Sequence, residues 1–188
     1  MVHIQKLEVK GYRALTELSV EGLGRVNLIT GANNSGKSSL LEVLRILASA
    51  GSPGVIREVL DQREERLHHA SSNAGASSIQ EFIPFTSLFS GRPGVPHSDD
   101  QIEIAGIGRN DERYLRLEVL WFLESVDLTG GKNYTRLVSA YAHEEGMVPV
   151  LRASGRHGVL ASYDSKLNLL RDLGDVGFGV EAQTNRLN

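Results

Sequence analysis

The first half of the chain alternates short apolar runs with glycine-containing links. Residues 4–9 and 18–20 are typical of two short strands, and the link between them includes Gly-Tyr-Arg at residues 11–13. Residues 26–30 form a β-rich run that ends abruptly at Gly31, as a buried strand that leads into a loop does. The pattern predicts a hairpin, then a buried strand, then a loop.

Helical spacing follows this loop. Apolar residues recur on one helical face over residues 38–48, and Gly51 can supply the left-handed residue that ends such a helix. Ser52 and Pro53 are typical of an N-cap and a first helical position. An apolar stripe then predicts a second helix that extends to about Leu67.

The pattern changes after a short polar segment. Residues 71–78 are small and polar, with nothing to bury, which predicts a flexible linker or loop. Beyond it, apolar and polar residues alternate over residues 102–104, 115–123 and 134–141, which predicts antiparallel strands with polar turns. A short amphipathic helix is expected over residues 165–173.

The loop between the third predicted strand and the first helix carries the main chemical signal. Residues 31–38 read Gly-Ala-Asn-Asn-Ser-Gly-Lys-Ser, which matches the Walker A pattern. Gly31 and Gly36 allow backbone angles that are closed to residues with a Cβ, so successive N–H groups can turn inward and bind an anion. The alternative is a glycine-rich turn that caps an ordinary helix, but a strand before and a helix after favour nucleotide binding.

Each polar residue of this loop has a predicted task. Lys37 is placed to reach the β- and γ-phosphates of ATP, and the Ser38 hydroxyl can ligate Mg²⁺. Ser39 can add a bond to the α-phosphate. The residues of this segment that we predict to bind nucleotide are Gly31, Asn33, Asn34, Ser35, Gly36, Lys37, Ser38 and Ser39.

Composition narrows the class of protein without changing this picture. The chain has 188 residues, 40% of them hydrophobic and 23% charged, which is ordinary globular usage. A net charge of -3 gives no global attraction to nucleic acid, so any DNA contact would have to be local. The absence of cysteine fits a reducing cytoplasm, and no run of apolar residues is long enough to span a membrane.

Residues 31–42, with Asn33 and a Leu-Leu-Glu continuation, resemble the Walker A segment of the ABC-type ATPases allied to RecF, SMC proteins and the OLD-family nucleases. The Gly-Tyr-Arg link between the first two strands is also similar. The resemblance implies an α/β P-loop NTPase lobe of the ABC ATPase head type, with an antiparallel β subdomain. It also implies that Arg13 contacts phosphate and that Tyr12 packs near the base or the core.

Two points of this resemblance have open alternatives. Tyr12 and Arg13 are equally well read as a buried aromatic and a solvated arginine. Residues 85–92 resemble the arm lobe of OLD-type ATPases only weakly. On this basis we expect a nucleotide-binding lobe over residues 1–70 and, after the linker, an antiparallel β-rich arm or subdomain of the same head over residues 79–188.

The chain departs from the family in what it lacks. There is no signature loop that opens a helix, and no hydrophobic strand runs directly into Asp-Glu. Residues 128–131, Leu-Thr-Gly-Gly, mimic a signature loop but lie between alternating runs, which predicts a hairpin turn. Glu124 follows an apolar run, but its alternation indicates one exposed face rather than a buried parallel strand. We therefore assign no catalytic residue and expect the N-terminal part of a larger ATPase.

The leading functional hypothesis is a cytoplasmic, Mg²⁺-dependent ATPase head that clamps ATP between two copies and transmits closure to DNA or to an effector such as a nuclease or toxin. Family analogy favours prokaryotic defence against phage over general DNA metabolism. One alternative is a scaffold that senses nucleotide without hydrolysing it. A P-loop kinase ranks last, because two strands precede the P-loop strand here.

The remaining charged residues are expected to be solvated. Arg57, Arg63 and Arg66 are interleaved with acidic residues, which predicts a mixed surface rather than a stripe that binds nucleic acid.

Overall fold

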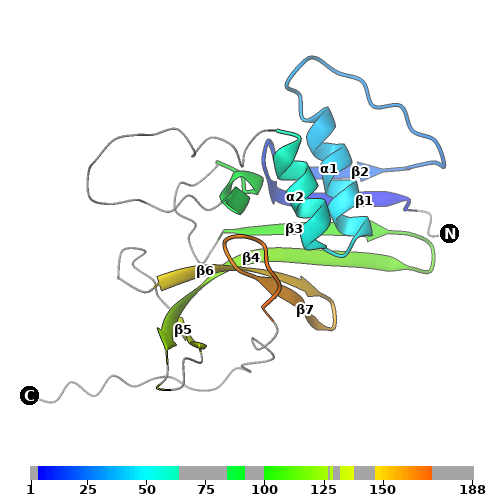
Figure 1. Ribbon diagram of the computed structural model, residues 1–188. Coiled ribbons are helices and arrows are strands. Elements are labelled where there is room, and N and C mark those ends of the chain that lie inside the picture. Colours follow the sequence, from blue (N-terminus) through cyan, green and yellow to red (C-terminus); the bar gives the residue numbers. More distant parts are fainter. Residues whose placement is uncertain are drawn as a thin grey trace, which may run out of the picture.

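The computed structural model describes residues 4–63, 84–91, 100–126, 128, 132–137 and 147–170. Within these residues the strands form one seven-stranded sheet in the order β2-β1-β3-β4-β6-β7, with β5 paired to β4, and every pair is antiparallel (Figure 1). The strands are β1 (Lys6–Tyr12), β2 (Leu15–Glu21), β3 (Gln101–Ile107), β4 (Glu112–Val126), β5 (Lys132–Leu137), β6 (Met147–Gly155) and β7 (Gly158–Tyr163). The helices are α1 (Lys37–Ala48), α2 (Pro53–Asp61) and the 3₁₀ helix η1 (Pro84–Leu88).

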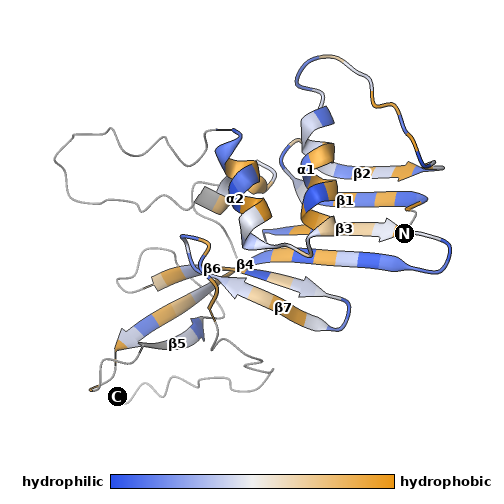
Figure 2. Cartoon of the chain, turned by 45° about the vertical axis from the view of Figure 1, so that its right-hand side comes forward, coloured by the Kyte–Doolittle hydropathy of each residue, from blue (hydrophilic) through white to orange (hydrophobic). Residues whose placement is uncertain are grey.

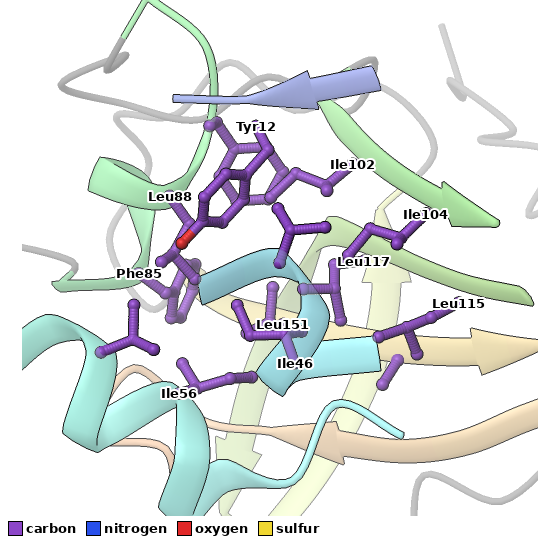
Figure 3. Packing of buried hydrophobic residues seen from close by; sticks show 14 of the residues in the cluster. Tyr12, Ile46, Ile56, Phe85, Leu88, Ile102, Ile104, Leu115, Leu117 and Leu151 are labelled. Atoms are coloured by element: carbon purple, nitrogen blue, oxygen red, sulfur yellow. The ribbon is translucent and has the colours of Figure 1, made fainter. Parts of the chain in front are cut away.

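The hydrophobic core lies between the helices and one face of the sheet. Val9, Ile104 and Leu115 are aligned across β1, β3 and β4, and all three are fully buried. Ile46 of α1 and Ile56 of α2 join the same cluster (Figure 3). Along β1 and the first part of β4, alternating residues place apolar side chains on this face and polar ones on the other, as Figure 2 shows. Further along β4, Leu120 and Phe122 point to the opposite face and form a second, smaller buried cluster with Val150 of β6.

Polar pairs occupy the opposite face of the sheet on β1, β2, β3 and the first part of β4. Lys6 forms ion pairs with Glu8 and with Glu21 of the neighbouring strand, at 3.0 and 2.9 Å. Further along, the Tyr114 hydroxyl donates to Glu103 at 3.0 Å. Cross-strand pairs of this kind stabilise an exposed sheet face only modestly, so most of the stability comes from the helix-covered face.

The first predicted hairpin and the first predicted helix are confirmed. β1 and β2 pair antiparallel, with Tyr12 opposite Leu15, and the strands are longer than the apolar runs alone indicated. α1 ends as expected: Gly51 has a φ of 73° and its N–H donates to the Ile46 carbonyl at 2.9 Å.

The second helix is shorter than predicted. α2 begins at Pro53 after the N-cap Ser52, as expected, but ends at Asp61. Its end is marked by hydrogen bonds from the backbone N–H groups of Gln62 and Arg63 to preceding carbonyls. Leu67 lies outside the described residues.

The prediction of a buried strand over residues 26–30 is wrong. No described strand pairs with this segment, and Val26 and Leu28 are 92% and 89% exposed. The apolar run is real, but a strand needs a neighbouring strand to bond its backbone N–H and C=O groups. In Figure 2 this run forms an orange stretch in the loop between β2 and α1, away from the sheet.

The helix predicted over residues 165–173 is also wrong for its described part, up to residue 170. The Asp164 carboxylate accepts the backbone N–H groups of Lys166 and Asn168 at 2.9 and 2.7 Å, which forms a local turn. Leu167 is buried with a φ of 61°, which a right-handed helix cannot contain. Arg57 of α2 then binds this turn through the carbonyls of 166 and 167.

The second half contains more β structure than the sequence suggested. The predicted hairpin around residues 128–131 is confirmed by its strands, since β4 and β5 pair antiparallel from Trp121 to Val126. The hairpin β6–β7 was not predicted, although two apolar runs flank a glycine-bounded turn there. The boundary at 71–78 lies outside the described residues, and the strands on its two sides share one sheet and one core.

Gly11 is the backbone position on which the β1–β3 pairing depends. It has a φ of 73°, and a Cβ added there would lie 2.1 Å from the backbone oxygen of Gln101. We expect Gly11→Ala to lower the free energy of unfolding by the left-handed backbone cost of about 1–2 kcal/mol, plus about 1–3 kcal/mol for the clash.

The matched control is Gly22→Ala, because Gly22 has a φ of 71° and no atom within 4 Å of the added Cβ. It should show the backbone cost alone in urea unfolding. Equal losses in the two variants would contradict the packing role of Gly11.

Candidate phosphate-binding site

The loop that precedes α1 has the backbone shape that its glycines predict. Gly31 and Gly36 have φ values of 156° and 88°, and Asn34 between them also has a positive φ, of 62°. A Cβ at Gly31 would lie 2.9 Å from the Ser35 hydroxyl, and one at Gly36 would lie 3.0 Å from the Leu15 side chain. Both glycines are therefore favoured by their positive φ, and a Cβ at either position would also displace a neighbouring side chain.

The loop leads directly into the N-terminus of α1. The first hydrogen bond of the helix runs from the Leu40 N–H to the Gly36 carbonyl, at 3.0 Å. The N–H groups of residues 37–39 precede that bond and have no partner inside the helix. They and the helix dipole favour an anion at this end.

Lys37 lies over the same loop. Its ammonium donates to the carbonyl oxygens of Gly31 and Ala32 at 2.8 and 2.5 Å, and these contacts are exposed to solvent. An exposed ammonium held by two carbonyls can exchange them for phosphate oxygens at little cost, since a hydrogen bond to a charged phosphate is stronger than one to a neutral carbonyl.

A cavity of about 870 Å³ gathers these groups, within the size range of small-molecule sites. Its lining residues are Arg13, Ala14, Asn33, Asn34, Ser35, Gly36, Lys37, Ser38, Ser39, Arg63 and Gly91. The structure thus brings together every residue that the sequence suggested for nucleotide binding except Gly31, which contributes its carbonyl to Lys37.

Arg13 enters the cavity from the turn between β1 and β2. It is 6% exposed, so the alternative of a solvated arginine is wrong. Its backbone has a φ of 47°, its N–H donates to the Leu88 carbonyl at 2.9 Å, and its own carbonyl accepts from the Ser90 hydroxyl at 2.9 Å. A non-glycine residue in this conformation costs about 1–3 kcal/mol and is maintained only by such surrounding contacts.

A buried carboxylate lies behind the cavity. One oxygen of Glu42 accepts from the Tyr12 hydroxyl at 2.8 Å and forms an ion pair with Arg13 Nε at 3.1 Å, and the other accepts from Arg63 Nε at 2.8 Å. The Nε–H of Arg13 donates to the Tyr12 hydroxyl at 3.2 Å. Glu42 itself is 6% exposed. Burial raises the pKa of Tyr12 above its ordinary value, so this hydroxyl stays protonated and donates.

Sequence reasoning missed the roles of Glu42 and Arg63. Arg63 was predicted to lie on a solvated face, but the structure turns it to the cavity wall and to Glu42. A signal for Glu42 was present, because it falls on the buried stripe of α1 together with Ser39, Val43 and Ile46. A charged residue on an apolar helical stripe needs a buried partner. The partners themselves were not visible from spacing.

The residues present fit a magnesium ion that is held mainly by nucleotide. The Ser38 hydroxyl lines the cavity beside Lys37. Within the described part of the chain, no group of three or more His, Cys, Asp or Glu residues could hold a metal ion by itself. Magnesium bound to ATP keeps phosphate oxygens and water among its ligands. In P-loop NTPases the hydroxyl of the loop Ser or Thr supplies one of the protein ligands, and Ser38 occupies that position here.

Other acidic residues with a possible catalytic position lie elsewhere. Glu124 is in β4, opposite Tyr134 of β5. The Asp-Glu pair of the sequence, residues 111–112, lies where β3 turns into β4, and Glu112 forms an ion pair with Arg156. None of these residues lines the cavity formed by the phosphate loop and the two arginines, which we call the phosphate-loop cavity.

In the described residues, no helix is long and apolar enough to cross a membrane.

Comparison with known proteins matches the part of the chain that carries this loop. Residues 3–86 match the AAA ATPase domain family. An ATP/GTP phosphatase of Helicobacter pylori is 41% identical over 138 residues, which covers 70% of this chain and 36% of that protein. The DNA replication and repair protein RecF of Acinetobacter baylyi is 28% identical over 105 residues, which covers 56% of this chain and 28% of RecF.

The likeness to solved structures is weak. A structure from work on ATP-driven dimerization and DNA-stimulated activation of SMC ATPases aligns with 86% of this chain and 69% of its own, at 16% identity and a TM-score of 0.28. A score this low supports no conclusion about this chain.

The chain spans only about a third of the length of the two curated relatives named above.

Glu42 should contribute strongly to stability. We expect Glu42→Gln to lower the free energy of unfolding by about 3–5 kcal/mol, because it leaves the buried Arg13 guanidinium without its carboxylate. The control is Glu58→Gln, which removes the partner of Arg45 in a pair whose side chains are 62% and 40% exposed. That change should cost less than about 1 kcal/mol. Similar urea midpoints for both variants would show that the buried contact contributes little.

Proposed function

We propose, from the premise that the chain belongs to the ABC-type P-loop ATPases of the RecF/SMC group, that its phosphate-loop cavity binds ATP with Mg²⁺. The observation that carries the proposal is the convergence of the loop 33–39 with two arginines from other elements in one cavity. Polar and cationic groups aimed into one concave site from separate elements are typical of a ligand site.

Each residue then has a defined role. The N–H groups of residues 37–39 bind phosphate oxygens at the helix N-terminus. Lys37 contacts the β- and γ-phosphates, Ser38 ligates Mg²⁺, and Ser39 bonds the α-phosphate. Arg13 contributes positive charge from the hairpin turn.

We further propose that this chain is the N-terminal, ATP-binding part of a larger ATPase head. Residues 26–30 support this, because their apolar side chains lie exposed beside a groove lined by α1 and the hairpin. Val26 and Leu28 line the groove together with Leu40 and Leu44. The occupant that fits is an apolar β-strand from the rest of the longer protein, which would pair with residues 26–30 and complete a sheet buried on both faces.

The role of the assembled protein is a proposal by analogy. The resemblance to OLD-type ATPases favours a cytoplasmic, dimeric head that controls an effector, a nuclease or a toxin, in prokaryotic defence against phage. The relative named for DNA replication and repair makes DNA metabolism the second candidate, with DNA as the partner.

ATP binding can be tested on this chain by ligand-induced stabilisation. At a hundredfold excess of MgATP over its Kd, the free energy of unfolding should rise by about 2.7 kcal/mol. Lys37→Ala should abolish the effect, whereas Lys10→Ala, an exposed lysine of β1 outside the cavity, should retain it. Stabilisation that survives Lys37→Ala would exclude the phosphate loop as the site.

Hydrolysis should require further residues. In the described part of the chain, the cavity lining presents cations, hydroxyls and amides, which can hold phosphates, but no carboxylate that could accept a proton from an attacking water molecule. We expect the purified chain to turn over ATP at about 10⁻³ per second or slower, like a P-loop protein that lacks its full catalytic set. Turnover near one per second, lost in Lys37→Ala, would reveal a catalytic residue that we have not identified.

A further inference from the structure

Arg63 is the cavity residue for which neither the sequence pattern nor the family resemblance suggested a role. It follows α2 and lines the wall of the phosphate-loop cavity, although in sequence it lies 24 residues after Ser39, the last loop residue in the lining. Its Nε donates to Glu42 at 2.8 Å, and its side chain is 32% exposed. A guanidinium that bonds a carboxylate through Nε still presents its terminal NH₂ groups in a fixed plane.

Arg13 and Arg63 share Glu42 but are held very differently. The side chain of Arg13 is 2% exposed, and its backbone is tied to residues 88 and 90 on both sides. Arg63 follows the C-cap of α2, and its side chain is 32% exposed. Arg13 is therefore a fixed charge, whereas Arg63 keeps part of its guanidinium accessible to a ligand while its Nε stays bonded to Glu42.

The charged side chains around the cavity favour an anionic ligand. Lys37, Arg13 and Arg63 supply three positive charges to its lining, and Glu42 behind them is the carboxylate that two of them contact. Among the described residues that line the cavity there are three cations and no carboxylate. A polyphosphate would supply the remaining negative charge, and a planar guanidinium can bind phosphate oxygens through two parallel hydrogen bonds.

We propose that Arg63 is a phosphate-binding residue for the nucleoside triphosphate and that Glu42 is the positioning residue that aims it. The proposal rests on the proposed function, since it assigns a further contact in the same site. It links α2 to the nucleotide, because Arg63 follows the end of this helix directly after its C-cap and closes one wall of the cavity. Glu42 holds Arg63 near its bound position, which lowers the entropy lost when the contact to phosphate forms.

The test is MgATP affinity by calorimetry, at low and at high salt, for the wild-type chain, Arg63→Gln and Arg63→Lys. Arg45→Gln is the matched control, because Arg45 pairs with Glu58 outside the cavity. We expect Arg63→Gln to weaken binding about tenfold at low salt, with the difference from wild type shrinking at high salt because screening weakens charge pairs. Arg63→Lys should retain part of the affinity, and Arg45→Gln should retain all of it.

Folding is checked for each variant by circular dichroism, and Lys37→Ala is measured beside them. If Arg63→Gln folds and binds within twofold of wild type while Lys37→Ala does not bind, Arg63 is not a ligand and the proposed function stands. A salt-independent loss would indicate a structural role and would likewise overturn the inference. If Arg63→Gln does not fold, the Arg63→Lys variant decides. Either an affinity equal to that of the wild type or a complete loss of binding would then contradict the proposal. Wild-type protein that does not bind MgATP overturns both.

Discussion

The buried carboxylate of Glu42 is the interaction on which the rest of this structure depends. It joins α1 to the β1–β2 hairpin through Tyr12 and Arg13, and to the end of α2 through Arg63. Three elements that are distant in sequence therefore meet at one charge. A carboxylate is costly to bury unless its oxygens accept several hydrogen bonds, and here each oxygen has at least one cationic partner. Because the buried Glu42 carboxylate needs both arginines as partners, it fixes the position of the phosphate loop relative to Arg13 and Arg63.

The sheet supplies the rigid surface for this arrangement. β1 carries the hairpin turn at its end, and its other residues are held between β2 and β3. α1 packs on the same sheet through an apolar stripe that includes Ile46 (Figure 3). The N-terminus of this helix and the turn with Arg13 therefore line one cavity. η1 lies between the turn and α2, where Phe85 and Leu88 fill the core. The contacts that pack α1 and η1 against the sheet therefore also position the residues that line the cavity.

The described residues leave the apolar side chains of residues 26–30 uncovered. The run at 26–30 has the composition of a buried strand and the surroundings of a loop. A phosphate loop usually receives its position from the strand before it, whereas here the loop is held from the other side, through Gly36 against Leu15 and through α1. This asymmetry explains why the local loop geometry forms although the preceding strand does not.

Local features were predictable from the sequence because they depend on neighbours in the chain. Helical spacing and Gly51 placed α1, alternation placed β3 and β4, and the glycines at 31 and 36 determined the loop. Features that depend on distant partners were not predictable: the run at 26–30 lacked a strand to pair with, and a turn built on Asp164 replaced an expected helix. The sequence by itself determined a phosphate loop at the start of a helix. Only the tertiary structure decided which charges surround it, because burial of one carboxylate drew two arginines from separate elements to the same place.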